Sequence, residues 1–178
     1  MPMPDIRLLS ETEALENLEA LKDVLADCVE DNASVGFMPP LQPADGEAFW
    51  RGVAGGVRRG EVLLYGAFVD DRLVGTVQVG FAQKPNQPHR GDLMKLLVHR
   101  KARGLGLSKA LMAAAEAGAK EAGRWLLVLD TARGELAESL YEKLGWQRSG
   151  IIPDYALFPD GRYCDTVVFY KRLDAAPA

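Results

Sequence analysis

The sequence predicts an α/β protein in which helices flank a mixed sheet. The central signal is a series of consecutive segments: an apolar run at 96–98, a Gly-rich turn at 103–108, an Ala-rich stretch at 109–123 and a second apolar run at 126–129. A strand, helix and strand in this order normally pair the two strands in parallel. Alternating apolar patterns before and after this unit predict hairpins, which add antiparallel strands to the same sheet.

The N-terminal part predicts a short strand followed by helices. Residues 6–9 have the strand pattern. Ser10 and Glu13 form the Ser-x-x-Glu pattern of a capping box, which predicts a helix that extends, with a break, to about Asn32. Residues 43–59 predict a second helical region. The loop before that region is expected to be either a lid or substrate wall, or only a cover for the core.

The rest of the chain alternates strands and helices. Two strands joined at Asp70-Asp71 predict one hairpin, and two strands turned at Pro159-Asp160-Gly161 predict another. The many small residues of the central helix would permit close packing on the sheet. The expected segments are strands at 61–69, 73–82, 92–99 and 125–130, helices at 104–123 and 135–144, and final strands at 146–158 and 162–173.

Length and hydropathy limit the domain number and the location. With 178 residues and 48% hydrophobic residues, the chain is long enough for one well-packed core and short for two. We therefore expect residues 1–178 to form one domain, with 174–178 as a frayed tail. The apolar runs fall far short of the ~20 residues that a membrane span requires, and Asp5 is acidic where a signal peptide would be basic. The expected location is the cytoplasm, without membrane attachment.

Charge and cysteine usage limit the partners. The formal net charge of −4 disfavours nucleic acid as the main partner, because phosphate-backbone binders usually carry a clustered basic excess. Cys28 and Cys164 lack metal-ligand spacing, so we expect two buried, reduced thiols, no disulfide and no metal. The oligomeric state stays open between a monomer and a homodimer.

The Gly-rich turn is a candidate phosphate site. Backbone N–H groups at a helix N-terminus are unpaired, and they attract phosphate. The P-loop pattern is absent, and a dinucleotide fingerprint beginning at Gly104 would need a glycine where Lys109 stands. Neither class is favoured. Residues 99–103, together with Lys109, concentrate positive charge beside the turn, as a polyanionic cofactor would require, although a solvated basic loop is the alternative.

These motifs resemble those of the GNAT acyltransferase superfamily. Arg103, Gly106 and Ser108 occupy the positions of its Arg/Gln-x-x-Gly-x-Gly/Ala signature, and residues 137–146 resemble its Ala-x-x-x-Tyr-Glu-Lys-x-Gly-Phe block. Ser108 replaces the final Gly/Ala, and Gly134 stands where many members have Asn. Further blocks resemble the branch that contains tabtoxin-resistance-type acetyltransferases; they cover residues 126–131, 159–161 and 170–171.

The resemblance implies acetyl-CoA as cosubstrate and a sheet splayed open between its fourth and fifth strands, which are parallel. It implies that the fourth strand bulges near Leu96 and frees a backbone N–H for the developing oxyanion. The implied cofactor-binding residues form two groups: Leu96, Leu97 and Val98 along the pantetheine arm, and Arg103, Gly104, Leu105, Gly106, Leu107, Ser108 and Lys109 around the pyrophosphate.

Acetyl transfer to an amine requires a base and an acid. An alkylammonium with a pKa near ~10.4 is neutral at pH 7 in only about one molecule in a few thousand. Deprotonating it at this pH therefore costs on the order of 4–5 kcal/mol. Asp92 stands where several members of the family keep a glutamate base, and is otherwise a solvated residue at a strand start. Asp130 ends a buried strand, and is otherwise a turn cap. Tyr141 matches the family's general-acid tyrosine, and is otherwise a polar tip on an apolar helix face.

The expected function is an N-acetyltransferase that moves an acetyl group from acetyl-CoA to a primary amine of a small molecule, such as an antimetabolite or amino-acid-like compound. Direct attack in a ternary complex is expected, because no histidine lies near Cys164 in sequence to activate it. Phe37, Trp50 and Tyr155 would favour a small acceptor if they lined a closed cavity. The alternatives are a protein N-terminal or lysine acetyltransferase, and a non-catalytic module that senses acyl-CoA.

Overall fold

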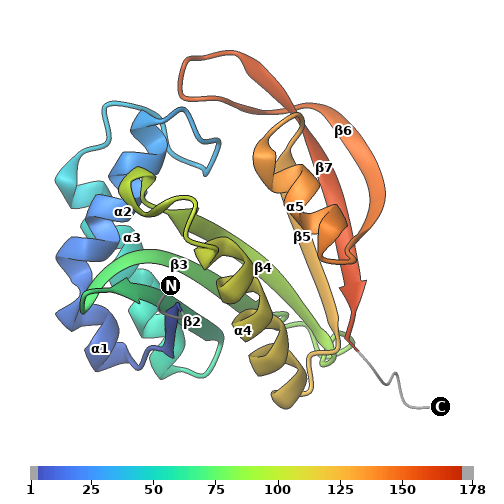
Figure 1. The fold of residues 1–178 in the computed structure, drawn as a ribbon. Coiled ribbons are helices and arrows are strands. Elements are labelled where there is room, and N and C mark those ends of the chain that lie inside the picture. The colour runs from blue at the N-terminus through green and yellow to red at the C-terminus, as the bar shows by residue number, and fades with distance from the viewer. Residues whose placement is uncertain (1–3, 174–178) are drawn as a thin grey trace.

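The computed structural model describes residues 4–173 and contains one seven-stranded mixed sheet (Figure 1). The strand order is β1-β2-β3-β4-β5-β7-β6. The strands are β1 (Asp5–Leu8), β2 (Val62–Val69), β3 (Arg72–Phe81), β4 (Arg90–Val98), β5 (Leu126–Ala132), β6 (Gln147–Leu157) and β7 (Tyr163–Arg172). The helices are α1 (Glu11–Glu16), α2 (Leu18–Glu30), α3 (Pro43–Arg58), the 3-10 turn η1 (Arg100–Ala102), α4 (Leu107–Glu121) and α5 (Leu136–Lys143).

The predicted fold class and element order are confirmed. Each expected strand and helix is present, and the ends differ by at most three residues, the largest shift being the start of α4 at Leu107. The capping box at Ser10 is formed in both directions, and the expected break in the helix falls at Asn17. The expected tail at 174–178 lies outside the described residues.

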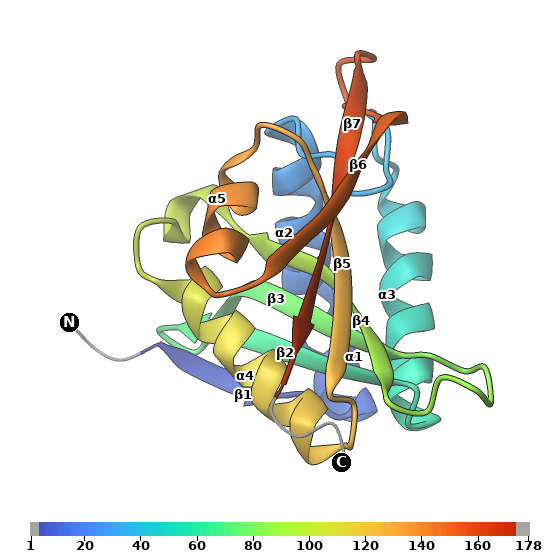
Figure 2. The same cartoon turned by 90° about the vertical axis from the view of Figure 1, so that its right-hand side faces the viewer.

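Two helical layers cover the sheet. The helices α1, α2 and α3 cover one face and α4 and α5 cover the other (Figures 1 and 2). The close approach of α4 depends on its small residues, as predicted: Ala115 and Ala119 are fully buried. A Cβ on Gly118 would lie 1.9 Å from the Tyr65 hydroxyl oxygen, so any larger side chain there would displace the Tyr65 ring.

The sheet consists of two antiparallel halves, and the strands of one half are inclined to those of the other. Strands β1 to β4 are antiparallel neighbours, and β5, β7 and β6 are antiparallel neighbours. The pairing of β4 with β5 is parallel and joins the halves. In Figure 2 the second half is steeply inclined to β2, β3 and β4. Within residues 4–173, none of the helices combines the length and the apolar character needed to cross a membrane.

Candidate active site

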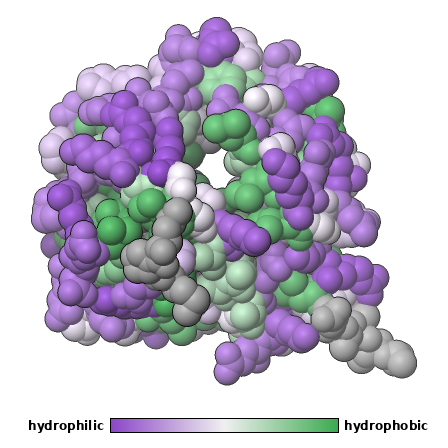
Figure 3. All heavy atoms as spheres, in the orientation of Figure 1, coloured by the Kyte–Doolittle hydropathy of each residue, from purple (hydrophilic) through white to green (hydrophobic). Residues whose placement is uncertain are grey.

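The strands β4 and β5 separate soon after they meet. Their parallel pairing has three rungs, of which the last joins Asp92 to Val128. Beyond it, β5 stays with β7 while β4 stays with β3. Figure 3 shows an opening through the molecule between the two halves, with hydrophobic residues around it. The predicted splay is therefore present. From Leu93 to Val98, the side of β4 that faces β5 is not paired with any strand of the described residues.

The fourth strand bulges at the position that the sequence predicts. Thr76 pairs with Leu97 and Gln78 with Met94, so β4 has one residue more than β3 over this stretch. Lys95 has a positive φ of 52°, a left-handed backbone conformation that residues other than glycine adopt infrequently. A bulge leaves its extra residue outside the ladder. The backbone of Lys95 and Leu96 therefore leaves the β3 ladder beside the opening.

The turn before α4 presents unpaired N–H groups. Gly104 and Gly106 have φ values of 80° and 75°, and Gly106 is the N-cap of α4 without a side-chain cap. The first helical bond runs from the Ala110 N–H to the Gly106 carbonyl at 3.1 Å. Among residues 4–173, no hydrogen-bond acceptor meets the N–H groups of 104–109. These groups and the positive end of the helix dipole favour an anion.

Two of the basic residues expected beside this turn form ion pairs with acids of α2 and its C-cap. The Arg100 backbone N–H and Nε both donate to the Asp27 carboxylate at 2.8 Å. The Arg103 guanidinium lies 2.5 Å from Asp31. The two arginines thus fasten the loop to the C-terminal end of α2, and acids that are distant in sequence neutralise them. Within the described part of the chain, Lys101 and Lys109 have no acidic partner within 4 Å.

Tyr141 lies on α5 beside the opening. Its side chain is buried, with ring centroids 5.9 Å from Phe169 and 6.1 Å from Trp146. Burial and then the negative charge of Asp130 raise the pKa of Tyr141 to about 12. The hydroxyl makes no hydrogen bond within residues 4–173, and it is not among the buried side-chain atoms without a partner. The hydroxyl oxygen is therefore not completely buried, and its raised pKa keeps it a neutral O–H at pH 7.

The two candidate carboxylates differ in position and pairing. Asp92 lies on the last β4–β5 rung, and its Oδ1 accepts a hydrogen bond from Arg90 at 2.5 Å. Asp130 lies two residues beyond that rung on β5, so it is in the open part of the split. Its Oδ2 accepts a hydrogen bond from Thr166 at 2.9 Å, and its side chain is otherwise exposed.

The structure adds Lys95, a site residue that the sequence analysis did not select. Its ammonium lies 5.7 Å from the ring centroid of Phe49 on α3. A Cβ on Gly36 would lie 3.9 Å from the same nitrogen. Burial lowers the pKa of Lys95, and the charge of Asp130 opposes that effect. The signal in the sequence is a single lysine inside the apolar run 93–98.

A loop from the N-terminal half closes the far end of the split. The side chain of Asn32 donates to Asp160 and accepts from its backbone N–H, both at 3.0 Å. The Ser34 hydroxyl donates to the Leu157 carbonyl at 3.1 Å. These contacts connect the loop after α2 to the β6–β7 hairpin.

The aromatic residues proposed as a wall do not form one surface. Phe37 contacts Phe49 edge-on at 5.3 Å. Trp50 is 1% exposed and belongs to the core under α2 and α3, whereas Tyr155 on β6 is 55% exposed. Trp50 is held in the core because the inner face of α3 must bury its apolar side chains against the sheet.

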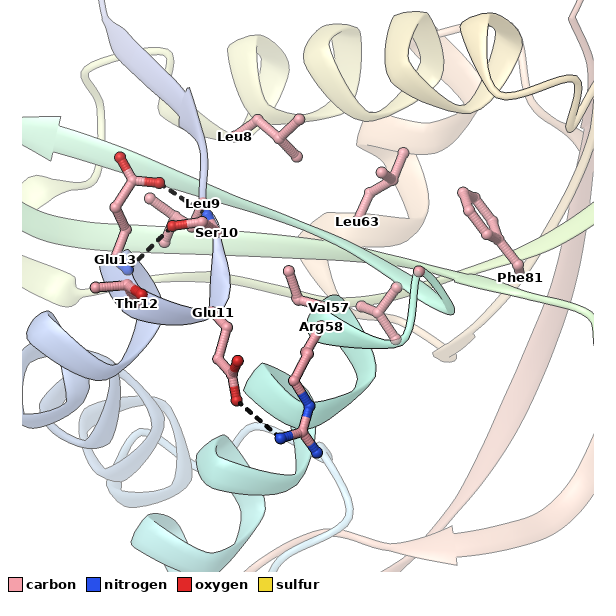
Figure 4. Close-up of a pocket in the computed structure, with 12 residues that line it drawn as sticks. Leu8, Leu9, Ser10, Glu11, Thr12, Glu13, Val57, Arg58, Leu63 and Phe81 are labelled. Atoms are coloured by element: carbon pink, nitrogen blue, oxygen red, sulfur yellow. Dashed lines mark hydrogen bonds and ion pairs between the residues drawn. The ribbon is translucent and has the colours of Figure 1, made fainter.

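A separate hollow of about 560 Å³ lies at the opposite edge of the sheet (Figure 4). It is lined by β1, the start of α1, the end of α3 and β2. Its polar groups already pair with one another: Ser10 with Glu13 in the capping box, and Glu11 with Arg58 at 3.9 Å. This hollow is therefore remote from the chemistry described above.

A splayed parallel strand pair, a bulged central strand and an uncapped Gly-rich helix start define the fold class of acetyl-CoA-dependent acyltransferases. The sequence model of the acetyltransferase (GNAT) family matches residues 18–146, which is more than half of the chain. The protein therefore belongs to the GNAT family of acetyltransferases. The predictions of an acetyltransferase and of acetyl-CoA as its cosubstrate are confirmed at the level of the family.

Solved structures share the fold along almost the whole chain. An N-acetyltransferase from Staphylococcus aureus Mu50 is 18% identical with a TM-score of 0.80, over 97% of this chain and 100% of that chain. A ribosomal-protein-alanine N-acetyltransferase from Brucella melitensis is 22% identical with a TM-score of 0.79, over 95% and 99%. A GNAT phosphinothricin acetyltransferase from Sinorhizobium meliloti, in complex with AcCoA, is 15% identical with a TM-score of 0.79, over 97% and 89%.

Proposed function

We propose that the protein transfers an acetyl group from acetyl-CoA to a primary amine of a small molecule, by direct attack in a ternary complex. The observation that carries this proposal is the run of unpaired N–H groups at 104–109, which begins α4 next to the open edge of β4. A diphosphate fits this cradle because its oxygens would supply the missing acceptors. The thioester arm fits the unpaired edge because it carries amide groups that can pair with a strand.

The chain offers a place for each part of acetyl-CoA. The N–H groups of 104–109 would hold the diphosphate, and the ammonium groups of Lys101 and Lys109 would add positive charge. Leu96, Leu97 and Val98 would pair with the pantetheine arm through their main chain. The Leu96 N–H, freed by the bulge, would donate to the thioester oxygen and stabilise the negative charge that develops there.

Tyr141 would act as the general acid. With a pKa of about 12 its hydroxyl stays protonated at neutral pH, so it can donate a proton to the departing thiolate of CoA. In the overall step the amine nitrogen forms a bond to the acetyl carbon and the bond from that carbon to sulfur breaks. The proton lost by the amine goes to a carboxylate, directly or through water, and Tyr141 regains a proton from solvent.

Asp130 is the carboxylate that the geometry supports better as this base. It lies in the open part of the split, and its charge acts on both Tyr141 and Lys95. Asp92, which the sequence favours first, lies at the closed end and shares its Oδ1 with Arg90. Asp92 stays the second candidate.

The state of the two cysteines supports direct attack. Cys28 is buried, and burial, followed by the charge of Asp27, raises the pKa of its thiol to about 11. Cys164 is also buried, and its sulfur lies 3.6 Å from the Ser34 hydroxyl. Both thiols are buried, whereas an acylated nucleophile needs access to solvent. The loop after α2, which is hydrogen-bonded to the β6–β7 hairpin, would narrow the acceptor side, and this supports a small molecule.

Calorimetry with acetyl-CoA, followed by thiol release across a panel of primary amines and peptides, tests this proposal. We expect binding, and turnover that Tyr141→Phe lowers by about 10²–10⁴-fold in kcat while the Kd for acetyl-CoA changes less than about threefold. An unchanged kcat removes Tyr141 from the mechanism. Binding without turnover of any acceptor supports a sensing module, and faster turnover of peptides than of small amines supports a protein acetyltransferase.

A further inference from the structure

Among residues 4–173, the acceptor side of the split contains a cation, Lys95, without an anionic partner within 4 Å. Lys95 extends from the bulge of β4 toward α3, where its ammonium lies 5.7 Å from the Phe49 ring centroid. On the other side, a Cβ added to Gly36 would lie 3.9 Å from the Lys95 nitrogen. Within residues 4–173, Lys95 makes no hydrogen bond and no ion pair within 4 Å, and Asp130 acts on it only from a longer distance.

Such a position is unfavourable unless the ammonium gains a partner. A half-buried cation loses hydration, and only a hydrogen bond or an opposite charge compensates for that loss. The lowered pKa of Lys95 has this loss as its main cause. The contact with Phe49 is a weak substitute, because a cation at this distance from a phenyl ring gains little.

Other hydrogen-bond donors on the same face of the sheet also lack acceptors. In the described residues, Trp50 Nε1 and Gln78 Nε2 are buried without a partner, as is Thr76 Oγ1. Val77 and Val79 pack in the core under α4, so the alternation of β3 directs Gln78 to the face of α2 and α3. Gln78 pairs with Met94, the neighbour of Lys95. Within the described residues, Gln78 therefore adds a second donor without an acceptor near the bulge that carries Lys95.

We propose that Lys95 is a specificity-determining residue that binds a carboxylate of the acceptor, so that the acceptor is a small amino acid or a close analogue with a free carboxylate. This inference rests on the proposed function. Lys95 directly precedes Leu96, whose N–H would meet the thioester oxygen, so the amine and the carboxylate would belong to one small molecule. Asp130, on the opposite strand, would attract the ammonium end of the acceptor and repel its carboxylate, which fixes the orientation.

The first test compares matched acceptors with the native enzyme and two variants. Each acceptor pair consists of an amino acid and its primary amide. The amide keeps the amine and loses the negative charge, and the lower pKa of its amine acts against the preference for the acid. We expect the native enzyme to prefer the acid by about 10- to 100-fold in kcat/KM, as for a charge-assisted hydrogen bond. Lys95→Met should abolish this preference mainly through KM for the acid, and Lys95→Arg should restore part of it.

Controls separate this role from a structural one. Lys84→Met removes an exposed lysine from the loop between β3 and β4 and should leave the preference intact. Lys95→Met should keep the native Kd for acetyl-CoA and a melting temperature at least as high, because it removes a partly dehydrated charge. Equal turnover of acid and amide by the native enzyme, or an equal loss of both in Lys95→Met, overturns the inference.

A binding measurement tests whether Lys95 binds a carboxylate even if none of the tested amines is acetylated. N-acetylglycine and N-acetylglycinamide, titrated into enzyme saturated with CoA, mimic a product with and without the charge. Tighter binding of the acid by about tenfold or more, lost in Lys95→Met, supports the inference, and equal binding overturns it. Failure of the proposed function is a different result: acetyl-CoA does not bind, or no amine is acetylated although the carboxylate is bound.

Discussion

The glycines at the two ends of α4 allow the phosphate cradle to be tested with a matched pair of variants. Gly106 at the start has a φ of 75°, and Gly123 just after the end has a φ of 76°. A Cβ added at either position would meet nothing within 4 Å. Changing each to Ala therefore imposes the same backbone penalty without a clash, but only Gly106 lies beside the unpaired N–H groups.

The expected magnitudes follow from this geometry. An L-residue in the left-handed region costs about 1–2 kcal/mol, so each variant should lose that amount of stability. For a domain of this size each kcal/mol lowers the melting temperature by about 2–4 °C. In Gly106→Ala the added methyl should also keep the diphosphate away from one or two N–H groups. Each such charged hydrogen bond is worth about 1.5–3 kcal/mol, so the Kd for acetyl-CoA should rise by at least about tenfold.

Thermal unfolding and calorimetry separate the two effects. Both variants should unfold at similarly lowered temperatures, whereas only Gly106→Ala should bind acetyl-CoA and CoA more weakly. Pantetheine, which lacks the diphosphate, should bind Gly106→Ala and Gly123→Ala equally well. If Gly106→Ala retained the acetyl-CoA affinity of Gly123→Ala within about twofold, the diphosphate would not lie on this helix start, and the assignment of residues 104–109 would be refuted.

Two further predictions concern the proposed acid and base. Asp130→Asn should lower kcat by about 10²–10⁴-fold at pH 7 and by less at pH 9, where more of the amine is already neutral, whereas Asp92→Asn should cost less than about tenfold. Initial rates at saturating acetyl-CoA measure both, and the reverse order would make Asp92 the base.

Because the folded-state pKa of Tyr141 is raised to about 12, its contribution to stability is complete below pH 10 and is lost as the pH rises toward 12. Between pH 9 and pH 11 the native protein should therefore lose about 1 kcal/mol more unfolding free energy than Tyr141→Phe in urea titrations, and equal losses would contradict the burial of this hydroxyl.

Local sequence patterns were sufficient for most of the fold. The capping box at Ser10, the turn residues of the two hairpins and the small residues of α4 act through neighbours in sequence, so their consequences could be predicted. The start of α4 at Leu107 was predicted three residues too early, because Gly104 and Gly106 both adopt positive φ values that a helix excludes.

The electrostatics of the site could not be predicted in the same way. Arg103 looked free in the sequence, but Asp31 lies against it because α2 ends beside the loop. The sequence favoured Asp92 over Asp130 as the base, but the structure shows that Asp92 meets Arg90 at the closed end and that Asp130 lies in the opening. Lys95 could be identified as a candidate site residue only from its position beside Phe49 and Gly36, which are far from it in the chain.

The sequence alone determined the order of strands and helices, the Gly-rich start of α4 and the family resemblance, because each depends on residues close together in the chain. Only the tertiary structure decided where β4 leaves β5, which charges are neutralised and which stay unpaired. The physical reason is that pairing and dehydration depend on the groups that the fold brings within a few ångströms. For Arg103 and Lys95, those groups come from distant segments.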